Sequence, residues 1–376
     1  MSEFQYYEFH AVDKPLNSED LESVRGMSSR VQLSSRKAVF TYSYSDFRYD
    51  EEEVLINYFD FMFYIANWGS KRIMMKFPAD LVDYEFLRKY RISVISSYAQ
   101  DIRIFKKSEF VILDISFSEE DGLGWIEEDN YGEEFLNIRD EIMRGDYQSL
   151  FVMWLRFLED LYKSDEFEFD YSFDASLIPP NLLPLNASGR AAQEFCLVSQ
   201  DWLDVMQLYS KQEEGETDFE DRIFRMPKDR MAQYLQMILR DEPNLKARLV
   251  KELGDKKANK GEDEQIRLAE IGEKAAVVEQ SRRKVEQQEK AQQELKKMND
   301  ILQNEDKIKQ EIIENIELGN SKYYKIAVSK LQELKSMNEY FKTQSDFNTF
   351  LNQITSEYSR KSSFIRMLEM TISMDE

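Results

Sequence analysis

The chain has 376 residues, of which 42% are hydrophobic and 13% aromatic, so it has enough apolar material for two or three packed domains. Its net charge is −22, and the excess is uneven: residues 1–245 hold 26 basic and 48 acidic side chains, whereas residues 246–376 hold 24 of each. The acidic excess argues against binding of nucleic acid or anionic lipid by residues 1–245 and favours protein partners with basic surfaces.

One cysteine, Cys196, excludes an intramolecular disulfide and fits a reducing compartment. The N-terminal segment lacks the basic and apolar regions of a secretory signal. No run of about 18 apolar residues occurs, so no membrane span is predicted. These features predict a cytoplasmic protein without a membrane partner.

Residues 1–130 read as an α+β domain. Strands are predicted at 4–12, 38–44, 72–77, 92–96, 101–105 and 110–117, because these segments are rich in aromatic and β-branched residues. Helices are predicted near 17–28, from 51 to about 66 and near 80–90; the second has an apolar face of Leu55, Tyr58, Phe59, Met62 and Ile65. The order suggests helices on one face of a sheet, with a ferredoxin-like arrangement as one candidate.

Residues 131–253 read as a helical domain. Apolar residues recur at helical spacing from Leu150 to Leu161, and further helices are predicted near 188–198, 200–210 and 218–252. The polar, glycine-containing stretch 254–264 is predicted to be a linker.

Residues 265–318 read as one long charged helix, which would span roughly 80 Å. Apolar residues from Leu268 to Val285 nearly keep a heptad, but Arg282, Glu289 and Gln292 interrupt it. We therefore expect a mostly solvated arm that pairs weakly or locally, with oligomerisation through a coiled coil as one outcome. Gly319-Asn320 ends the arm, and residues 319–376 read as a small helical hairpin, within which 321–368 would form an independent module.

The sequence shows no complete catalytic constellation, so an enzyme is less expected than a non-catalytic protein. His10 and Cys196 stand alone in the sequence, and neither a phosphate-binding glycine loop nor a Gly-x-Ser-x-Gly elbow occurs. Acidic residues at 119–121, 127–129 and 133–134, and Asp114 in a strand, leave a divalent-metal site open. No catalytic, cofactor-binding or metal-binding residue is assigned, and no cofactor is expected.

Several segments resemble an uncharacterised bacterial protein family. The matching pieces are residues 2–9 (Ser-Glu-Phe-Gln-Tyr-Tyr-Glu-Phe), 11–16, 28–30, 46–48, 58–60, 66–70, 145–146 leading to 154–155, 178–180, 324–334 and 360–364 (Arg-Lys-Ser-Ser-Phe). The N-terminal piece is the specific one, similar to a SEYQYYEF motif, and the last resembles an RKxSF end. Ser362 departs from the proline expected there. The resemblance covers nearly the whole chain and implies architecture, but it carries no known activity, so no catalytic residue transfers.

Three functions remain open. The first is a non-catalytic interaction or scaffold protein in a bacterial multi-protein system. The second is a divalent-metal-dependent nuclease or phosphohydrolase that uses carboxylates. The third is a nucleic-acid-associated factor that uses Arg282, Arg283 and Lys284 on the arm. For partner binding, the candidates are aromatic residues outside the apolar stripes of the predicted hairpin: Tyr323, Tyr340, Phe341 and Phe364.

Overall fold

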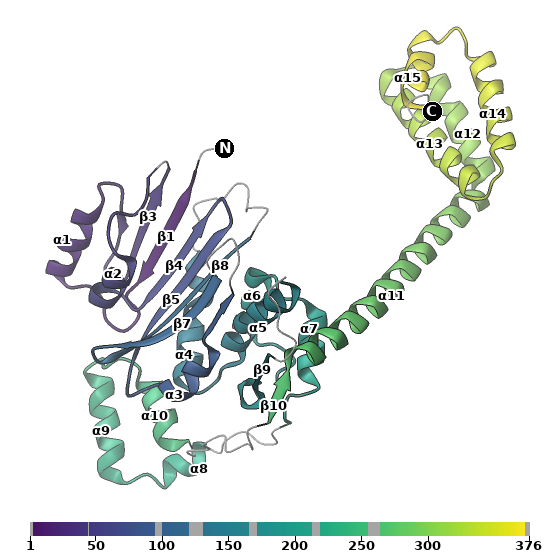
Figure 1. Cartoon of the computed structure of the whole chain (residues 1–376). Coiled ribbons are helices and arrows are strands. Elements are labelled where there is room, and N and C mark those ends of the chain that lie inside the picture. The colour runs from purple at the N-terminus through teal and green to yellow at the C-terminus, as the bar shows by residue number, and fades with distance from the viewer. Residues whose placement is uncertain are drawn as a thin grey trace. The chain divides into compact units, whose positions relative to one another are not determined.

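The computed structural model describes residues 3–43, 45–94, 100–119, 131–164, 171–212, 219–254 and 264–372. The chain divides into two compact units, unit 1 (Met1–Val278) and unit 2 (Glu279–Glu376). Figure 1 labels the helices and strands of both units.

Unit 1 is built on one eight-stranded sheet with the order β2-β3-β1-β4-β5-β8-β7-β6. Every pairing between neighbouring strands is antiparallel. The strands are β1 Gln5–His10, β2 Gln32–Leu33, β3 Lys37–Tyr42, β4 Phe61–Ala66, β5 Ser70–Pro78, β6 Ile92–Val94, β7 Gln100–Lys107 and β8 Phe110–Ser118. The predicted α+β class is confirmed. The ferredoxin-like candidate is not, because that arrangement contains a split βαβ unit with parallel strands.

Helices cover both faces of this sheet, not one face as the element order suggested (Figure 1). Successive strand side chains point to opposite faces, so Tyr6 and Tyr7 belong to different cores. Tyr7 packs in a core with α1 (Ser18–Met27) and α2 (Glu51–Tyr58). On the other face, Tyr6 shares a core with the helices that follow the sheet in sequence.

The predicted helix from 51 to about 66 is wrong in its second half. Asp50 caps α2 by accepting a hydrogen bond from the Glu53 backbone N–H, and the helix ends at Tyr58. Phe61–Ala66 forms strand β4, which pairs with β1 and β5 in the middle of the sheet. Because both faces of β4 are covered, its sequence is apolar throughout and shows no alternation.

The predicted helical domain 131–253 does not have a core of its own. Side chains of α4 (Leu136–Met143) and α5 (Gln148–Lys163) share one core with the sheet. The other helices of unit 1 before α11 are α3 Tyr84–Leu87, α6 Ala187–Cys196, α7 Gln200–Gln207, α8 Phe219–Phe224, α9 Lys228–Leu239 and α10 Leu245–Leu253, with short 3₁₀ turns at Arg88–Tyr90, Tyr131–Phe135 and Ala175–Leu177.

Unit 1 closes with a two-stranded sheet and the start of α11 (Leu268–Gln303). Strand β9 (Ser172–Asp174) pairs with β10 (Gln265–Arg267), which runs directly into α11. Leu268, Ile271 and Ala275 of α11 are buried in the main core of unit 1. The boundary between units therefore falls inside α11 and not at the predicted linker 254–264, most of which lies outside the described residues.

Unit 2 contains the rest of α11 and four helices: α12 Glu305–Leu318, α13 Ser321–Tyr340, α14 Gln344–Glu357 and α15 Ser362–Ile372. The predicted continuous helix 265–318 is thus interrupted at Asn304. Gly319, at φ +74°, ends α12, and the Asn320 side chain caps α13.

The predicted module 319–376 is only part of this unit. Ile312 and Ile316 of α12 are fully buried against α13, and Met298 and Ile301 of α11 join the same core. A hairpin of α13 and α14 alone would leave that core open, so the independent module is corrected to a bundle that begins within α11.

Candidate functional site: an exposed apolar surface on α8 and α9

Helix α9 has an apolar face that no other described part of the chain covers. Pro227 precedes the first helical residue and the helix ends at Leu239. Met231, Leu235, Ile238 and Leu239 recur at the spacing of one helix face. The exposed fraction is 62% for Leu235, 56% for Ile238 and 85% for Leu239, so this face lies in solvent.

Helix α8 adds two more apolar side chains. Ile223 is 38% exposed and Phe224 is 77% exposed. We call the set Ile223, Phe224, Leu235, Ile238 and Leu239 the α8–α9 surface. A single exposed leucine is ordinary, but five large apolar residues exposed on two consecutive short helices make this segment a candidate interaction site.

Polar contacts on another side of α9 hold it in place. Arg230 forms a two-point ion pair with Glu252 of α10, with both N···O distances 2.7 Å. The Tyr234 hydroxyl donates to the same carboxylate at 2.7 Å. The hydrogen bonds from Arg230 and then Tyr234 lower the pKa of the Glu252 carboxyl. At about 100° per residue, Arg230 lies well away from Leu235 and Leu239, so these contacts leave the apolar face uncovered.

Helix α10 attaches this small helical group to the rest of unit 1. Ala247 is buried in the main core, and Arg248 forms an ion pair with Asp80 at 2.8 Å. Tyr234 is the one buried residue of α8 and α9. The two helices therefore gain little from burial of their own apolar residues.

The charge around the α8–α9 surface is nearly balanced. Residues 219–254 carry 8 basic and 6 acidic side chains, in contrast to the acidic excess of residues 1–245 as a whole. A ligand at this surface would therefore be held mainly by apolar contact, not by charge.

Comparison of the chain with protein-family models, curated proteins and solved structures finds no match. No helix among the described residues is long and apolar enough to cross a membrane. The resemblance to a bacterial family stays a prediction.

The four predicted partner-binding aromatics do not form one surface. Phe364 is fully buried in the core of unit 2, where its ring lies 5.7 Å from that of Tyr324, so its prediction as a surface anchor is wrong. Tyr340 is 41% exposed, and its ring contacts Phe341, which is partly buried against the same core. Tyr323 is half-buried and stands 17 residues before Tyr340 on α13, or about 25 Å along the helix axis.

His10 belongs to a buried polar network. Its Nε2 lies 2.6 Å from Oε1 of Glu8, a fully buried carboxylate. Lys37 and the Tyr6 hydroxyl also contact that carboxylate, at 2.8 and 2.7 Å. His10, Tyr6 and Glu8 all lie on β1, and Lys37 of β3 joins this network to the neighbouring strand. Cys196 lies on α6, and no contact joins the two residues as a nucleophile and base.

The Cys196 thiol is 2% exposed, and burial raises its pKa to about 12. We expect the folded protein to react with a thiol reagent at neutral pH far more slowly than the unfolded chain, because the thiolate is the reactive form. The reaction rate is measured with an aromatic disulfide reagent, from the absorbance of the coloured thiolate that it releases, in the presence and absence of guanidinium. Equal rates in both conditions would contradict the buried position of Cys196.

Asp114 is not arranged as a metal ligand. Its side chain is 1% exposed, and Arg72 donates to both carboxylate oxygens at 2.8 and 3.0 Å. Arg103 contacts the same carboxylate. Two guanidinium groups thus neutralise this acid and link β5, β7 and β8.

The predicted acidic clusters lie largely outside the described residues, which exclude 120–130. Glu119 pairs with Lys71, and Glu133 pairs with Lys37 at 3.3 Å. In the described part of the chain, no group of three or more His, Cys, Asp or Glu side chains is placed to hold a metal ion.

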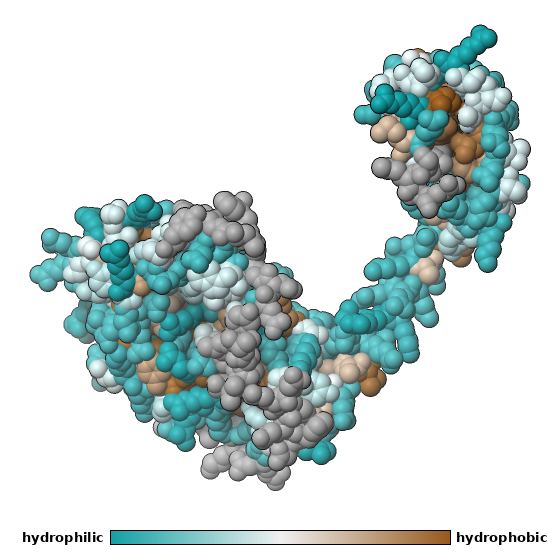
Figure 2. Space-filling model, turned by 45° about the horizontal axis from the view of Figure 1, so that its top comes forward, coloured by the Kyte–Doolittle hydropathy of each residue, from teal (hydrophilic) through white to brown (hydrophobic). Residues whose placement is uncertain are grey.

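The predicted basic positions on the arm point in different directions. Arg282, Arg283 and Lys284 are all exposed, and successive helical residues differ by about 100°. Arg282 pairs with Glu286 and Arg283 with Glu279 on the same helix. The middle of α11 is hydrophilic with few apolar atoms (Figure 2). These residues do not form one basic stripe.

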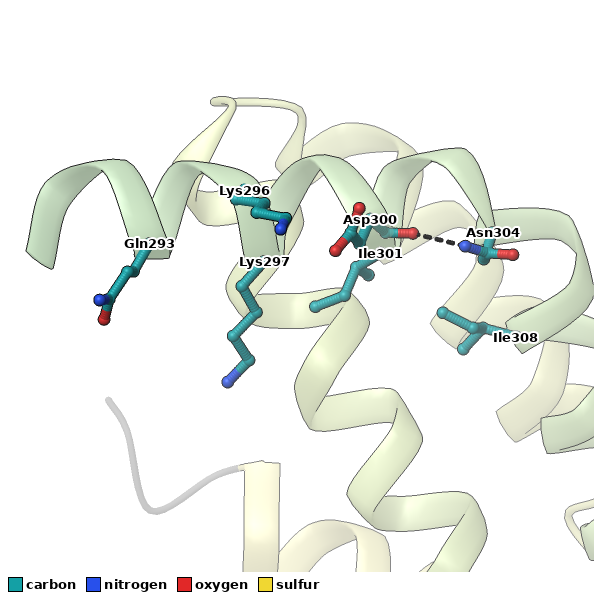
Figure 3. A pocket seen from close by; sticks show the side chains of 7 residues that line it. All are labelled: Gln293, Lys296, Lys297, Asp300, Ile301, Asn304 and Ile308. Carbon is teal, nitrogen blue, oxygen red and sulfur yellow. Dashed lines mark hydrogen bonds between the residues drawn. The ribbon is translucent and has the colours of Figure 1, made fainter. Parts of the chain in front are cut away.

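A shallow pocket lies where α11 meets α12. Its volume is about 390 Å³, and Ile301 and Ile308 lie in its lining beside charged residues (Figure 3). The Asn304 side chain does not point a donor at a ligand, because Nδ2 donates to the Asp300 carbonyl at 2.8 Å. Lys296 and Lys297 are exposed lysines at its rim. The pocket has no buried polar group that would orient a substrate.

The α8–α9 surface was not predictable from helical periodicity, because periodicity alone does not say whether a helix face is covered. One signal was present: Met237-Ile238-Leu239 makes three consecutive apolar residues, which is wider than a helix with one packing partner requires.

Proposed function

We propose that this chain is a non-catalytic interaction or scaffold protein of a bacterial multi-protein system, and that it binds a partner protein through the α8–α9 surface. The observation that carries the proposal is the exposure of Phe224, Leu235 and Leu239, at 77%, 62% and 85%. Fully burying a side chain of this size contributes about 1.5–3 kcal/mol, so a partner would gain substantially by covering them.

The fitting partner presents an apolar helix face or pocket at the contact. Recognition of this kind uses a few apolar anchors at helical spacing, as Leu235, Ile238 and Leu239 provide. The acidic excess of residues 1–245 favours a partner whose wider surface is basic, because opposite charge speeds association over a distance. The apolar contact then sets the lifetime of the complex.

Replacing both Leu235 and Leu239 by Lys tests this proposal. The wild-type protein is immobilised, incubated with an extract of its native host, and the bound proteins are identified by mass spectrometry. A specific partner should then bind the double variant at least tenfold more weakly than the wild type, because two central anchors are lost. Both substitutions keep a good helix former, so the unfolding temperature should stay the same or rise.

The matched control is Leu208→Lys, an equally apolar and 74% exposed position outside the α8–α9 surface. This variant should keep the partner. If the double variant and the control retain the partner equally well, the α8–α9 surface is not the docking site.

The same purified protein and extract also test the two other functions, a carboxylate enzyme and a nucleic-acid-associated factor. A carboxylate enzyme would show stabilisation by Mg²⁺ or Mn²⁺ in a thermal unfolding experiment. A nucleic-acid-associated factor would bind DNA or RNA from the extract, and the bound amount would fall steeply as the salt concentration rises. Neither effect is expected of an interaction protein.

A further inference from the structure

The middle of α11 has no packing partner within the described chain. Every residue from 280 to 297 is exposed. The ion pairs Arg282–Glu286 and Arg283–Glu279 support this stretch, but each such pair adds only about 0.2–0.5 kcal/mol. Most helical stability in proteins comes from tertiary packing, which this stretch lacks among the described residues, so a second helix alongside it would be stabilising.

One face of this stretch carries no charge. Starting at Val285, positions spaced alternately by three and four residues are all uncharged, although charged residues are frequent around them. We call this set the α11 seam: Val285, Gln288, Gln292, Leu295, Asn299 and Leu302. Its apolar members are well exposed, Val285 at 53%, Leu295 at 42% and Leu302 at 44%.

This register differs from the one that the sequence suggested. A heptad counted from Leu268 places Arg282 and Glu289 at the seam. The structure buries Leu268, Ile271 and Ala275 in the core of unit 1, so these residues cannot belong to an exposed seam. Counted from Val285 instead, the 3-4 spacing runs to Leu302 without a charged residue.

We propose that the α11 seam pairs in parallel with the α11 seam of a second copy of this chain. Val285, Gln292 and Asn299 then take the a positions, and Gln288, Leu295 and Leu302 take the d positions. A β-branched residue at a with leucine at d favours two strands, and a single asparagine at an a position favours a defined register.

Charge complementarity selects the parallel orientation. In this register Lys284 is a g position and Glu289 is the following e position, and these two positions meet across a parallel pair. Among the residues that the structure describes, neither side chain has a hydrogen bond or ion pair. In an antiparallel pair a g position faces a g position, so Lys284 would not meet Glu289 of the second copy.

The amide side chains at three of the six seam positions make this a weak and reversible pairing. The expected behaviour is a monomer at low concentration that becomes a dimer as concentration rises, measured by sedimentation equilibrium. The variant Gln288→Leu/Gln292→Ile fills the seam and should strengthen the dimer at least tenfold. Arg283→Leu/Lys290→Leu, at outward positions of the same helix, should leave it unchanged.

Orientation is tested by a single new cysteine. In a parallel pair Val285→Cys faces itself and should form an intermolecular disulfide under mild oxidation, whereas Glu286→Cys, at an outward position, should not; the buried Cys196 is common to both. A wild type and a seam-filled variant that both stay monomeric would overturn the pairing. A dimer in which the two cysteine variants cross-link equally would overturn the parallel seam.

Discussion

Replacing Arg139 by Met will lower the free energy of unfolding of unit 1 by about 3 kcal/mol, the lower end of the cost of breaking a buried ion pair, because Arg139 is fully buried but the side chain of its partner Asp13 is 17% exposed. The Arg139 side chain is fully buried and donates to both oxygens of Asp13 at 2.8 Å. Its Nε also donates to the Lys76 carbonyl at 2.7 Å, which links α4 to β5. Met fills a similar volume but supplies no donor, so Asp13 and the carbonyl lose their partners.

Denaturant unfolding followed by tryptophan fluorescence measures this effect in unit 1 alone. All four tryptophans lie at positions 68, 125, 154 and 202, within unit 1. The control is Arg144→Met on the adjacent C-terminal cap of α4, where the side chain donates to the Asp140 carbonyl of its own helix and the change should stay within about 0.5 kcal/mol. Equal effects of the two substitutions would show that the Arg139–Asp13 pair does not stabilise the fold.

Replacing Glu8 by Gln will destabilise unit 1 by on the order of 3 kcal/mol at neutral pH, and the difference will shrink as pH falls. Burial alone would raise the pKa of the Glu8 carboxyl. The hydrogen bonds from His10, Lys37, Tyr6 and the Gly132 backbone outweigh burial and lower this pKa from 4.5 to about 2. A lowered folded-state pKa stabilises the fold above the unfolded value, and this stabilisation is lost as pH falls from about 4.5 towards 2.

Unfolding curves in urea at neutral pH and at several values below pH 4.5 give the comparison, read from the same tryptophans. Glu22→Gln, an exposed position on α1, serves as the control and should show no difference from wild type at either pH. A Glu8→Gln difference that stays constant across this pH range would mean that the carboxylate is not stabilised by its neighbours.

The sequence predicted the fold class and most strands of unit 1, because Gln5–His10, Lys37–Tyr42 and Phe110–Ser118 are bounded by clear turn residues. The sequence-based prediction was wrong at β4. A strand covered on both faces shows no alternation of apolar and polar residues, so its apolar residues fit a helix equally well. The prediction also treated residues 131–253 as a separate domain. Periodicity shows that α5 has an apolar face, but it does not show that this face packs on the sheet.

The candidate site was less predictable than the fold. Leu235 and Ile238 were visible as a helical stripe, and only three-dimensional packing shows that nothing in the described chain covers them. The opposite error occurred at Phe364, which lies outside the main stripes of its region but is fully buried by α13. An aromatic residue outside the main apolar stripe of its helix is exposed only if no further helix or strand packs against it. The sequence pattern of one helix does not show whether such a further element is present.

The placement of the β9–β10 pair has a consequence for how the chain folds. This pair joins residues 172–174 to 265–267, and the main core of unit 1 also takes Ile271 and Ala275 of α11. Unit 2, by contrast, packs helices that follow one another in sequence. Folding slows as the sequence separation of contacts grows, so unit 2 should form quickly and unit 1 slowly. On the ribosome, the first residues made must wait for a stretch near position 275 before their core is closed, and the N-terminal sheet spends that interval incomplete.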